Sequence, residues 1–429
     1  MEAEKDLIML VDDNPANLQA GKNVLDEKYD VVTTPSAEKM FRLLVHNTPA
    51  LILLDIDMPE MNGYEAIKIL KSKAETANIP VIFLTGKTES GDELKGLSLG
   101  AIDFITKPFQ PPLLLKRIEV HLLVEKQARE LRYFNENLHK AFSTYLSGDV
   151  VEELIADPTR LQLGGIKRRM SVVFTDIQNF SRISEILAPD ELVYLLNDYL
   201  TALSDAILDQ KGTIDKYNGD AIMAFFGAPL ELPDHALRSC ISAIIMKRRE
   251  VELNKKFAET KKSPMPFLTR IGIHTGDMIV GNIGTERKMN YTIMGHAVNI
   301  ASRLEGINKQ YGTWILASED TVKECGDRIF TRRLDRIRVV GINEPVRIYE
   351  VLELADKVTP ELREQTELFH GALSFFEERD WNAAQRAFGK TLEKRPDDRP
   401  SLLYLERCRQ YLLKAPDQDW DGVYNLSEK

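Results

Sequence analysis

Two acidic residues, Asp176 and Asp220, are the side chains whose type and setting point most directly to chemistry. Each lies at the edge of an apolar, strand-like stretch, and Asp220 follows a glycine. Two carboxylates brought together in this way can hold two divalent cations over a triphosphate, because hard cations prefer oxygen ligands and two of them can clamp a displacement at phosphorus. The sequence therefore predicts a metal site that these two residues share.

A second group of polar side chains lies nearer the N-terminus, where other apolar stretches end. It contains three carboxylates, a hydroxyl and an ammonium: Asp12, Asp13, Asp55, Thr85 and Lys107. The carboxylates would repel one another unless a hard cation such as Mg²⁺ joined them. One carboxylate could then attack a phosphoryl donor while the metal and the lysine neutralise the developing charge. The alternative is a structural cluster of salt bridges.

Short apolar runs and amphipathic stretches alternate over residues 6–125 and would position this second group. Strands are expected at Leu7–Val11, Leu51–Leu54, Val81–Leu84 and Phe104–Ile105. Helices are expected at Asn17–Leu25, Ala37–His46, Tyr64–Lys73 and Glu93–Leu99. This βα alternation predicts a doubly wound parallel sheet, in which sites lie at the carboxyl ends of the strands.

The first acidic pair belongs to a second α/β unit, which is expected over residues 168–352. Strands are expected at Ser171–Phe174, Ala221–Phe226 and Leu268–His274, and helices at Asp190–Leu208, Leu237–Phe257 and Val298–Gln310. The glycine pair Gly164-Gly165 predicts a turn before a strand that begins near Met170.

One long helix is expected between the two units, from Pro112 to about Ser147. Two series recur every seven residues along it: Val124, Leu131, Leu138 and Tyr145, and Val120, Gln127, Phe134 and Ala141. Such an a/d seam predicts a coiled coil with a partner helix. The alternative is a helix that packs on its own domain.

Residues 360–429 are expected to be all-helical. The segments around Leu362–Arg379 and Trp381–Phe388 resemble one tetratricopeptide-like helix pair, with Ser401–Leu413 as a flanking helix. A single repeat cannot bury its own apolar face, so we expect it to pack on a neighbour. Structural capping is favoured over peptide binding.

The composition bounds the class of protein and its partners. The chain has 429 residues with 43% apolar and 28% charged residues, as soluble globular proteins do. A net charge of -10 argues against a nucleic-acid partner. No apolar run reaches the ~18 residues of a membrane span, and the acidic start Met1–Asp6 is unlike a secretory signal. We expect a cytoplasmic protein with three reduced cysteines and no membrane insertion.

The N-terminal unit resembles a response-regulator receiver domain, with a flavodoxin-like fold. The resemblance rests on four motifs: Val11-Asp12-Asp13-Asn14, Leu54-Asp55-Ile56-Asp57-Met58-Pro59, Leu84-Thr85-Gly86 and Thr106-Lys107-Pro108-Phe109. It implies that Asp55 is the phosphoacceptor for a cognate sensor histidine kinase. It also implies one Mg²⁺ on Asp12, Asp13 and Asp55, with the backbone carbonyl of Asp57. By the same resemblance, Lys107 and Thr85 contact the phosphoryl oxygens, and Phe104 is the switch aromatic.

The second unit resembles a class III adenylate/guanylate cyclase domain, with a ferredoxin-like α/β fold. The matching segments are Val173–Ser181, Lys216–Gly227, Arg270–Gly276, Gly281–Gly284 and Asn290–Leu304. The resemblance implies that Asp176, Asp220 and Ile177 hold two Mg²⁺ or Mn²⁺ ions per site. It also implies that the turn Ile177–Phe180 offers backbone N–H groups to the β- and γ-phosphates.

Base choice in this family rests on two positions, which here carry Lys216 and Thr292. Lys216 can donate to N1 of adenine, and the Thr292 hydroxyl can accept from the 6-amino group. The resemblance also implies that Asn299 and Arg303, four residues apart on one helix face, orient the ribose and stabilise the pentavalent phosphorus. These residues and the metal carboxylates would come from different protomers, so a head-to-tail homodimer with two sites is expected.

One departure from the family's pattern concerns a phosphate contact. The family often carries Val-Lys-Gly-Lys near the end of the domain, where this chain has Val339-Val340-Gly341-Ile342. Losing one charged contact could cost roughly 1.5–3 kcal/mol, for which Arg336 or Arg338 could compensate.

The sequence thus predicts a response regulator that converts ATP to 3′,5′-cyclic AMP and pyrophosphate at a homodimer interface, under the control of Asp55 phosphorylation. The alternatives are a guanylate cyclase and a weakly active, cyclase-like interaction platform. The predicted parts are a receiver domain (1–125), a dimerising linker helix (113–147), a transducing segment (148–167), the catalytic domain (168–352) and the C-terminal region (360–429).

Overall fold

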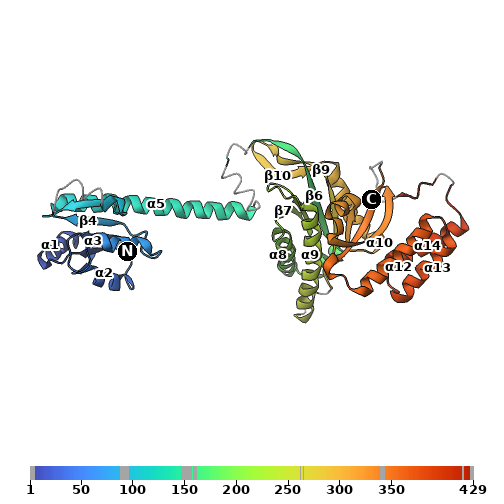
Figure 1. The fold of residues 1–429 in the computed structure, drawn as a ribbon, viewed down its shortest axis with the longest axis horizontal. Coiled ribbons are helices and arrows are strands. Elements are labelled where there is room, and N and C mark those ends of the chain that lie inside the picture. Colours follow the sequence, from blue (N-terminus) through green and yellow to red (C-terminus); the bar gives the residue numbers. More distant parts are fainter. Residues whose placement is uncertain are drawn as a thin grey trace. The chain divides into compact units, whose positions relative to one another are not determined.

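A computed structural model describes residues 5–86, 96–145, 157, 162–260, 262–263, 265–338, 344–417 and 420–425 (Figure 1). The chain divides into two compact units, Met1–Ala141 and Phe142–Lys429. Within the described residues, no helix combines the length and the apolar character that crossing a membrane would require. The three cysteines are buried as free thiols.

The first unit is built on a five-stranded parallel sheet with the order β2-β1-β3-β4-β5. Its strands are β1 (Leu7–Val11), β2 (Asp30–Thr34), β3 (Leu51–Asp55), β4 (Val81–Thr85) and β5 (Asp103–Thr106). Its shorter helices are α1 (Pro15–Leu25), α2 (Ala37–Leu44) and α3 (Gly63–Ser72). The predicted doubly wound parallel sheet is confirmed, although β2 was missed. The helix expected at Glu93–Leu99 lies partly outside the described residues.

Local sequence signals fix where these helices begin. The side chains of Asn14 and Ser36 accept backbone N–H groups at the starts of α1 and α2, which satisfies donors that have no intrahelical partner. Asn62 and Glu65 form a reciprocal capping box at the start of α3. Apolar side chains on both faces of the sheet then form two cores, so the helices cover the sheet from both sides.

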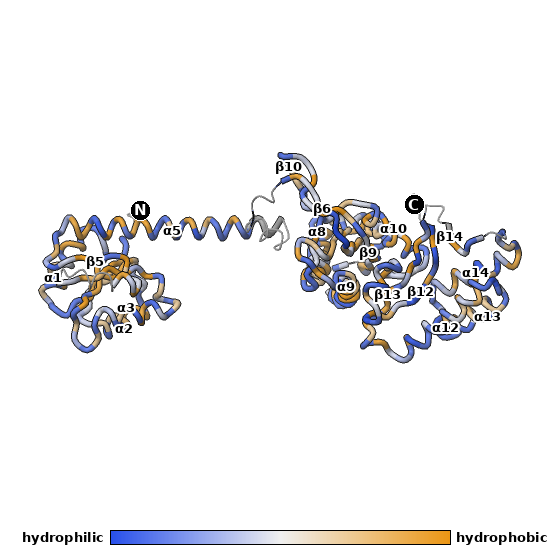
Figure 2. The backbone as a smooth tube through the Cα atoms, turned by 45° about the horizontal axis from the view of Figure 1, so that its top comes forward, coloured by the Kyte–Doolittle hydropathy of each residue, from blue (hydrophilic) through white to orange (hydrophobic). Residues whose placement is uncertain are grey.

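The helix α5 (Pro111–Tyr145) starts in the core of the first unit and continues beyond it as one element. Leu114 and Ile118 are buried against the sheet. Farther along, Val124, Leu131 and Phe134 are 57%, 60% and 62% exposed, and apolar residues recur along the helix (Figure 2). The long helix is confirmed, whereas its predicted partner helix remains a prediction.

The second unit is built on a nine-stranded sheet with the order β14-β12-β13-β11-β9-β6-β8-β7, in which β10 pairs with β9 off this path. The strands are β6 (Gly164–Ile177), β7 (Thr213–Asn218), β8 (Ala221–Phe226), β9 (Thr269–Thr285), β10 (Lys288–Met294), β11 (Ile315–Ser318), β12 (Ile329–Arg338), β13 (Val346–Leu354) and β14 (Tyr424–Asn425). The helices are α7 (Phe180–Ile186), α8 (Pro189–Leu208), α9 (His235–Glu259), α10 (His296–Tyr311), α11 (Glu319–Cys325), α12 (Pro360–Glu377), α13 (Trp381–Lys394) and α14 (Arg399–Leu413), with 3₁₀ turns η2 (Gly326–Arg328) and η3 (Ala355–Lys357).

Two faces of this sheet carry different helices. Val173 and Ile177 of β6 share a core with α8 and α9. Met170 and Val172 belong to the same strand but lie on the opposite face of the sheet, and they share a core with α10. Figure 1 shows α8 and α10 on opposite sides of the strands β6 and β9. The two faces therefore position different groups of candidate site residues.

The glycine pair at Gly164-Gly165 is not the predicted turn. Both residues belong to β6, where Gly164 pairs with Asn282 and Gly165 with Gly281 of β9. A Cβ on Gly281 would lie 2.2 Å from the carbonyl oxygen of Gly164, so two backbones approach here too closely for side chains. The prediction failed because glycine marks close strand contact as well as turns.

The C-terminal region packs on the face of the sheet that carries α10. Its helices share one buried core with α10, β11, β12 and β13. Arg407 of α14 donates to Asp335 of β12 over 2.6 Å, and Tyr311 at the end of α10 donates to the same carboxylate over 2.5 Å. The region is also not all-helical as predicted, because β14 pairs in parallel with β12. Its three helices are present, while the resemblance to a tetratricopeptide repeat remains a prediction.

Candidate active site

The two carboxylates of the predicted metal site lie close together at one end of the sheet. Asp176 is the penultimate residue of β6, and Asp220 lies in the turn between β7 and β8. Gly219 permits that turn with a φ of 65°. Asp220 Oδ2 accepts the backbone N–H of Ile177 over 3.1 Å, which ties the second carboxylate to the residue next to the first.

Burial makes both carboxylates unfavourable as free anions. Burial raises the pKa of Asp176, although the guanidinium of Arg270 opposes the shift. Burial likewise raises the pKa of Asp220, and the charge of Asp176 adds to the shift. Carboxylates that repel each other in a partly desolvated setting are stabilised by cations. The donor set, two carboxylates with a strand-end backbone, therefore fits divalent cations that prefer oxygen.

Two further charged residues, which sequence reasoning did not single out, lie behind Asp176. Arg270 of β9 is the cross-strand neighbour of Asp176, and its Nη2 lies 3.1 Å from Asp176 Oδ2. Glu305 of α10 lies on the other side of Arg270, with 3.5 Å between Arg270 Nε and Glu305 Oε1. Burial first, and then the charge of Asp176, raise the pKa of Glu305 to about 7. The signal was available, since Arg270 opens a quoted motif and Glu305 follows Arg303 by two residues.

The turn after Asp176 offers fewer free amides than predicted. The Ile177 N–H donates to Asp220, and the Gln178 N–H donates to the Leu268 carbonyl over 2.8 Å. Asn179 adopts a left-handed conformation with a φ of 58° just before α7 begins at Phe180. A phosphate interaction at this turn would therefore rest on the amides of Asn179 and Phe180.

The predicted base-reading residues lie side by side around a third residue, Asp215. Lys216 Nζ lies 3.1 Å from Asp215 Oδ1 and 3.5 Å from Thr292 Oγ1. The Thr292 hydroxyl donates to Asp215 Oδ2. Asp215 was missed in the sequence, although it directly precedes Lys216, because nothing in the chain order reveals that a carboxylate would receive the threonine proton.

The remaining pair, Asn299 and Arg303, lies on α10 one turn apart. Asn299 is exposed and Arg303 is half-buried. In the described part of the chain, neither side chain makes a hydrogen bond or an ion pair. Within those same residues, neither this pair nor Lys216 and Thr292 form a hydrogen bond or an ion pair with the carboxylates Asp176 and Asp220. A single chain thus brings the predicted site residues together in separate groups.

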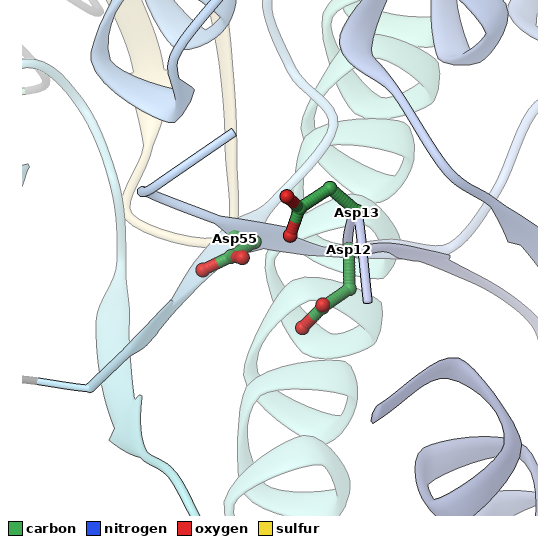
Figure 3. Close-up of side chains that lie close together, drawn as sticks. All are labelled: Asp12, Asp13 and Asp55. Atoms are coloured by element: carbon green, nitrogen blue, oxygen red, sulfur yellow. The ribbon is translucent and has the colours of Figure 1, made fainter. Parts of the chain in front are cut away.

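The receiver site is assembled at the carboxyl ends of β1, β3 and β5. Ligand atoms of Asp12, Asp13 and Asp55 lie within 4.8 Å of one another (Figure 3). Lys107 Nζ lies 2.5 Å from Asp12 Oδ2 and 2.7 Å from Asp55 Oδ1. Burial raises the pKa of Asp55, and the Lys107 ammonium opposes the shift. Three carboxylates this close fit one hard divalent cation.

The rest of the receiver site shows how the strand ends connect to α5. Thr85 ends β4 as a buried residue. Phe104 of β5 is half-buried, and Arg117 of α5 donates to its carbonyl over 2.8 Å. Arg117 also donates to Asp103 over 2.6 Å. A side chain of the long helix therefore holds the strand that carries the predicted switch aromatic. The Asp57 backbone also donates to Asp55.

Residues 339–343, which include the departures at Val340 and Ile342, lie outside the described residues. Arg338, just before them, pairs with Asp421 over 3.1 Å. Arg336 is exposed.

The comparison with protein families identifies both units. Residues 8–119 match the family described as the response regulator receiver domain. Residues 166–352 match the adenylate and guanylate cyclase catalytic domain. The chain therefore carries a receiver domain followed by a cyclase catalytic domain, as the motifs indicated.

Several known proteins resemble the chain. It is 34% identical over 236 residues to adenylate cyclase 1 of Rhizobium meliloti, covering 53% of this chain and 35% of the relative. It is 38% identical over 191 residues to an adenylate cyclase of Anabaena cylindrica, covering 43% and 37%. It also matches the crystal structure of the guanylyl cyclase Cya2, with 33% identity, 46% and 98% coverage and a TM-score of 0.43. The chain spans little more than a third of the length of the two curated relatives.

Proposed function

We propose that this chain is a response regulator whose output is the conversion of ATP to 3′,5′-cyclic AMP and pyrophosphate. The observation that carries the proposal is the carboxylate pair Asp176 and Asp220, joined through Ile177 within the matched cyclase domain. Divalent cations bound there would stabilise the attacking ribose 3′-oxygen and the departing pyrophosphate. The names of the two curated relatives, both adenylate cyclases, support the same reaction.

The contact between Thr292 and Asp215 favours adenine over guanine. A threonine hydroxyl alone can donate or accept, so it distinguishes the two bases poorly. Here its proton is directed to the Asp215 carboxylate. Lys216 Nζ contacts the same oxygen over 3.5 Å, and the second lone pair is left as an acceptor for a 6-amino group. Lys216 beside it remains a donor for N1. A guanine would place its 6-carbonyl against the Thr292 acceptor and its N1–H against the Lys216 ammonium, and neither contact is favourable.

We place the complete site between two protomers. Among the described residues, Asn299 and Arg303 form no hydrogen bond or ion pair with the metal carboxylates, and Arg303 is a cation without a counter-ion there. An arginine fork suits a pentavalent phosphorus that carries negative charge. The exposed apolar series on α5 gives an independent reason for two copies to associate.

Control by phosphorylation is proposed through β5 and α5. Phosphorylation of Asp55 by a histidine kinase would change the charge beside Lys107 and Thr85. Arg117 connects the Phe104 backbone to α5, so a movement of β5 would reach the helix that precedes the cyclase domain. A two-state element that a modification biases in this way is sufficient for regulation.

The test is product analysis of the purified chain with ATP or GTP and with Mn²⁺ or Mg²⁺. Cyclic AMP is the expected product, and Asp176→Asn should abolish its formation. Mixing Asp220→Ala with Arg303→Ala chains should restore part of the activity, because one composite site then regains both halves. Cyclic GMP as the main product would replace the ATP assignment with a guanylate cyclase.

A second candidate is a cyclase-like interaction platform with little activity. The replacement of two family lysines by Val340 and Ile342 favours it. The absence of any cyclic nucleotide from the wild-type chain and from the mixture, with Mn²⁺ present, would support this candidate over the enzyme.

A further inference from the structure

Two buried polar atoms behind Asp176 face each other without completing a hydrogen bond. Arg270 Nε and Glu305 Oε1 lie 3.5 Å apart, and within the described residues neither atom has a hydrogen-bond partner. Unpaired buried polar atoms are costly, and native proteins seldom leave them so. A small movement of Arg270 toward Glu305 would satisfy both atoms at once.

Arg270 also forms an ion pair with Asp176, on the side away from Glu305. Arg270 Nη2 lies 3.1 Å from Asp176 Oδ2, and the two residues are direct cross-strand neighbours on β6 and β9. The guanidinium is thus shared between a completed contact at Asp176 and an incomplete one at Glu305. A divalent cation at Asp176 would compete for that carboxylate and repel the guanidinium.

The backbone of Glu305 has no room to move closer to the strand. Its backbone is fixed where α10 crosses β9, because a Cβ added at Gly272 would lie 2.2 Å from the Glu305 nitrogen and 2.4 Å from the Ala301 oxygen. The helix and the strand are in direct contact at this point. The gap between Arg270 Nε and Glu305 Oε1 therefore closes by rotation of side chains, and Arg270 is the member of the trio that also contacts Asp176.

We propose that Glu305 is a positioning residue for the metal site. When a divalent cation binds Asp176, the guanidinium of Arg270 moves to Glu305 and pairs with its carboxylate. This inference rests on the proposed function, since it takes Asp176 and Asp220 as the metal ligands. By pairing with Arg270, Glu305 neutralises a cation that would otherwise lower the affinity of the site for metal. Glu305 acts through Arg270 and touches no substrate.

The test measures bound Mn²⁺ directly by electron paramagnetic resonance on the full chain. The receiver site also binds cations, so the cyclase site is obtained as the difference between a given chain and the same chain carrying Asp176→Asn and Asp220→Asn. Glu305→Gln keeps the size of the side chain and removes its charge. It should weaken Mn²⁺ binding at the cyclase site on the order of tenfold, while saturating Mn²⁺ restores most of the turnover.

Two further variants separate action through Arg270 from a direct or structural effect. Glu305→Asp keeps the charge and should retain most of the Mn²⁺ affinity. The double variant Arg270→Gln/Glu305→Gln removes both charges and should bind Mn²⁺ more tightly than Glu305→Gln alone, because the unpaired cation has gone. Circular dichroism of each variant establishes that it is folded.

Unchanged Mn²⁺ affinity in Glu305→Gln would overturn the proposal. Equal weakening in Glu305→Gln and in the double variant would also overturn it, because Glu305 would then act without Arg270. A failure of the proposed function looks different: the Asp176→Asn/Asp220→Asn chain would bind as much Mn²⁺ as the wild-type chain.

Discussion

Replacing Gly272 with alanine should push α10 away from the sheet. Gly272 lies in β9 beneath α10, and its added Cβ would lie 2.2 Å from the Glu305 nitrogen and 2.4 Å from the Ala301 oxygen. Non-bonded heavy atoms ordinarily come no closer than about 3.5 Å. The helix α10 must therefore move away from the strand by about 1 Å. Both obstructing atoms are backbone atoms, which cannot rotate out of the way.

The expected cost falls on both activity and stability. Asn299 lies just before the contacting stretch of α10, from Ala301 to Glu305, and Arg303 lies within it. A misplacement of about 1 Å at reacting groups can lower a rate on the order of a hundredfold. Overpacking a core typically lowers the free energy of unfolding by about 1–3 kcal/mol. Cyclic AMP formation with Mn²⁺ and ATP should therefore fall steeply, and the melting temperature of the cyclase unit should fall with it.

Gly306→Ala is the matched control on the same helix. A Cβ at Gly306 has no atom within 4 Å, and alanine is about 0.5–1 kcal/mol more favourable than glycine inside a helix. This variant should keep wild-type turnover and melt at the same or a higher temperature. Beryllofluoride binding at Asp55 should be unchanged in both variants, because the receiver belongs to the other unit. If Gly272→Ala matched Gly306→Ala in turnover and melting, the account of the helix contact would be wrong.

Four other predictions concern base choice, pH, association and control. Asp215→Asn should reduce the preference for ATP over GTP in competition assays, because Thr292 no longer has an anion to receive its proton; an unchanged ratio refutes this role. Burial lowers the pKa of His274 in the folded chain to about 4. As the pH falls below about 6.5, His274 therefore becomes protonated in the unfolded chain before it does in the folded chain, and the folded chain loses stability. Urea denaturation should show a loss of about 3 kcal/mol between pH 6.5 and 4, and His274→Asn should flatten that slope; an unaltered slope would exclude His274 as its source. The double variant Leu131→Asp/Leu138→Asp should lower both the mass measured by light scattering and the turnover. If this variant still forms a dimer, α5 is not part of the dimer interface. Asp55→Asn should abolish any change of turnover caused by beryllofluoride; a response that persists in this variant places control elsewhere.

The elements were predictable wherever the signal was local. Four of the five strands of the receiver sheet followed from short buried apolar runs, whereas β2 was missed. The four-residue spacing of Asn299 and Arg303 placed them correctly on one helix. Contacts between segments distant in the chain were not predictable. The glycines at the start of β6 take their meaning from Gly281, more than a hundred residues later.

The candidate site divides along the same line. Motifs identified Asp176, Asp220, Lys216 and Thr292, because each belongs to a recognisable run of residues. Residues that contact these side chains from the neighbouring strand or helix belong to no motif that would single them out in the sequence. Glu305 gains its importance from a strand opposite it and from Gly272 between them. Only a three-dimensional arrangement reveals such support.

The packing of the C-terminal helices has a consequence for how such chains can be recombined. The match to the cyclase family ends at residue 352, yet the buried core that holds α10 continues into α12, α13 and α14. A fusion joined at that border would leave Leu334, Ile348 and Tyr311 without their apolar cover, and Asp335 without Arg407. For this chain, the unit that evolution or an engineer can transfer intact therefore extends through β14, beyond the border that family similarity marks.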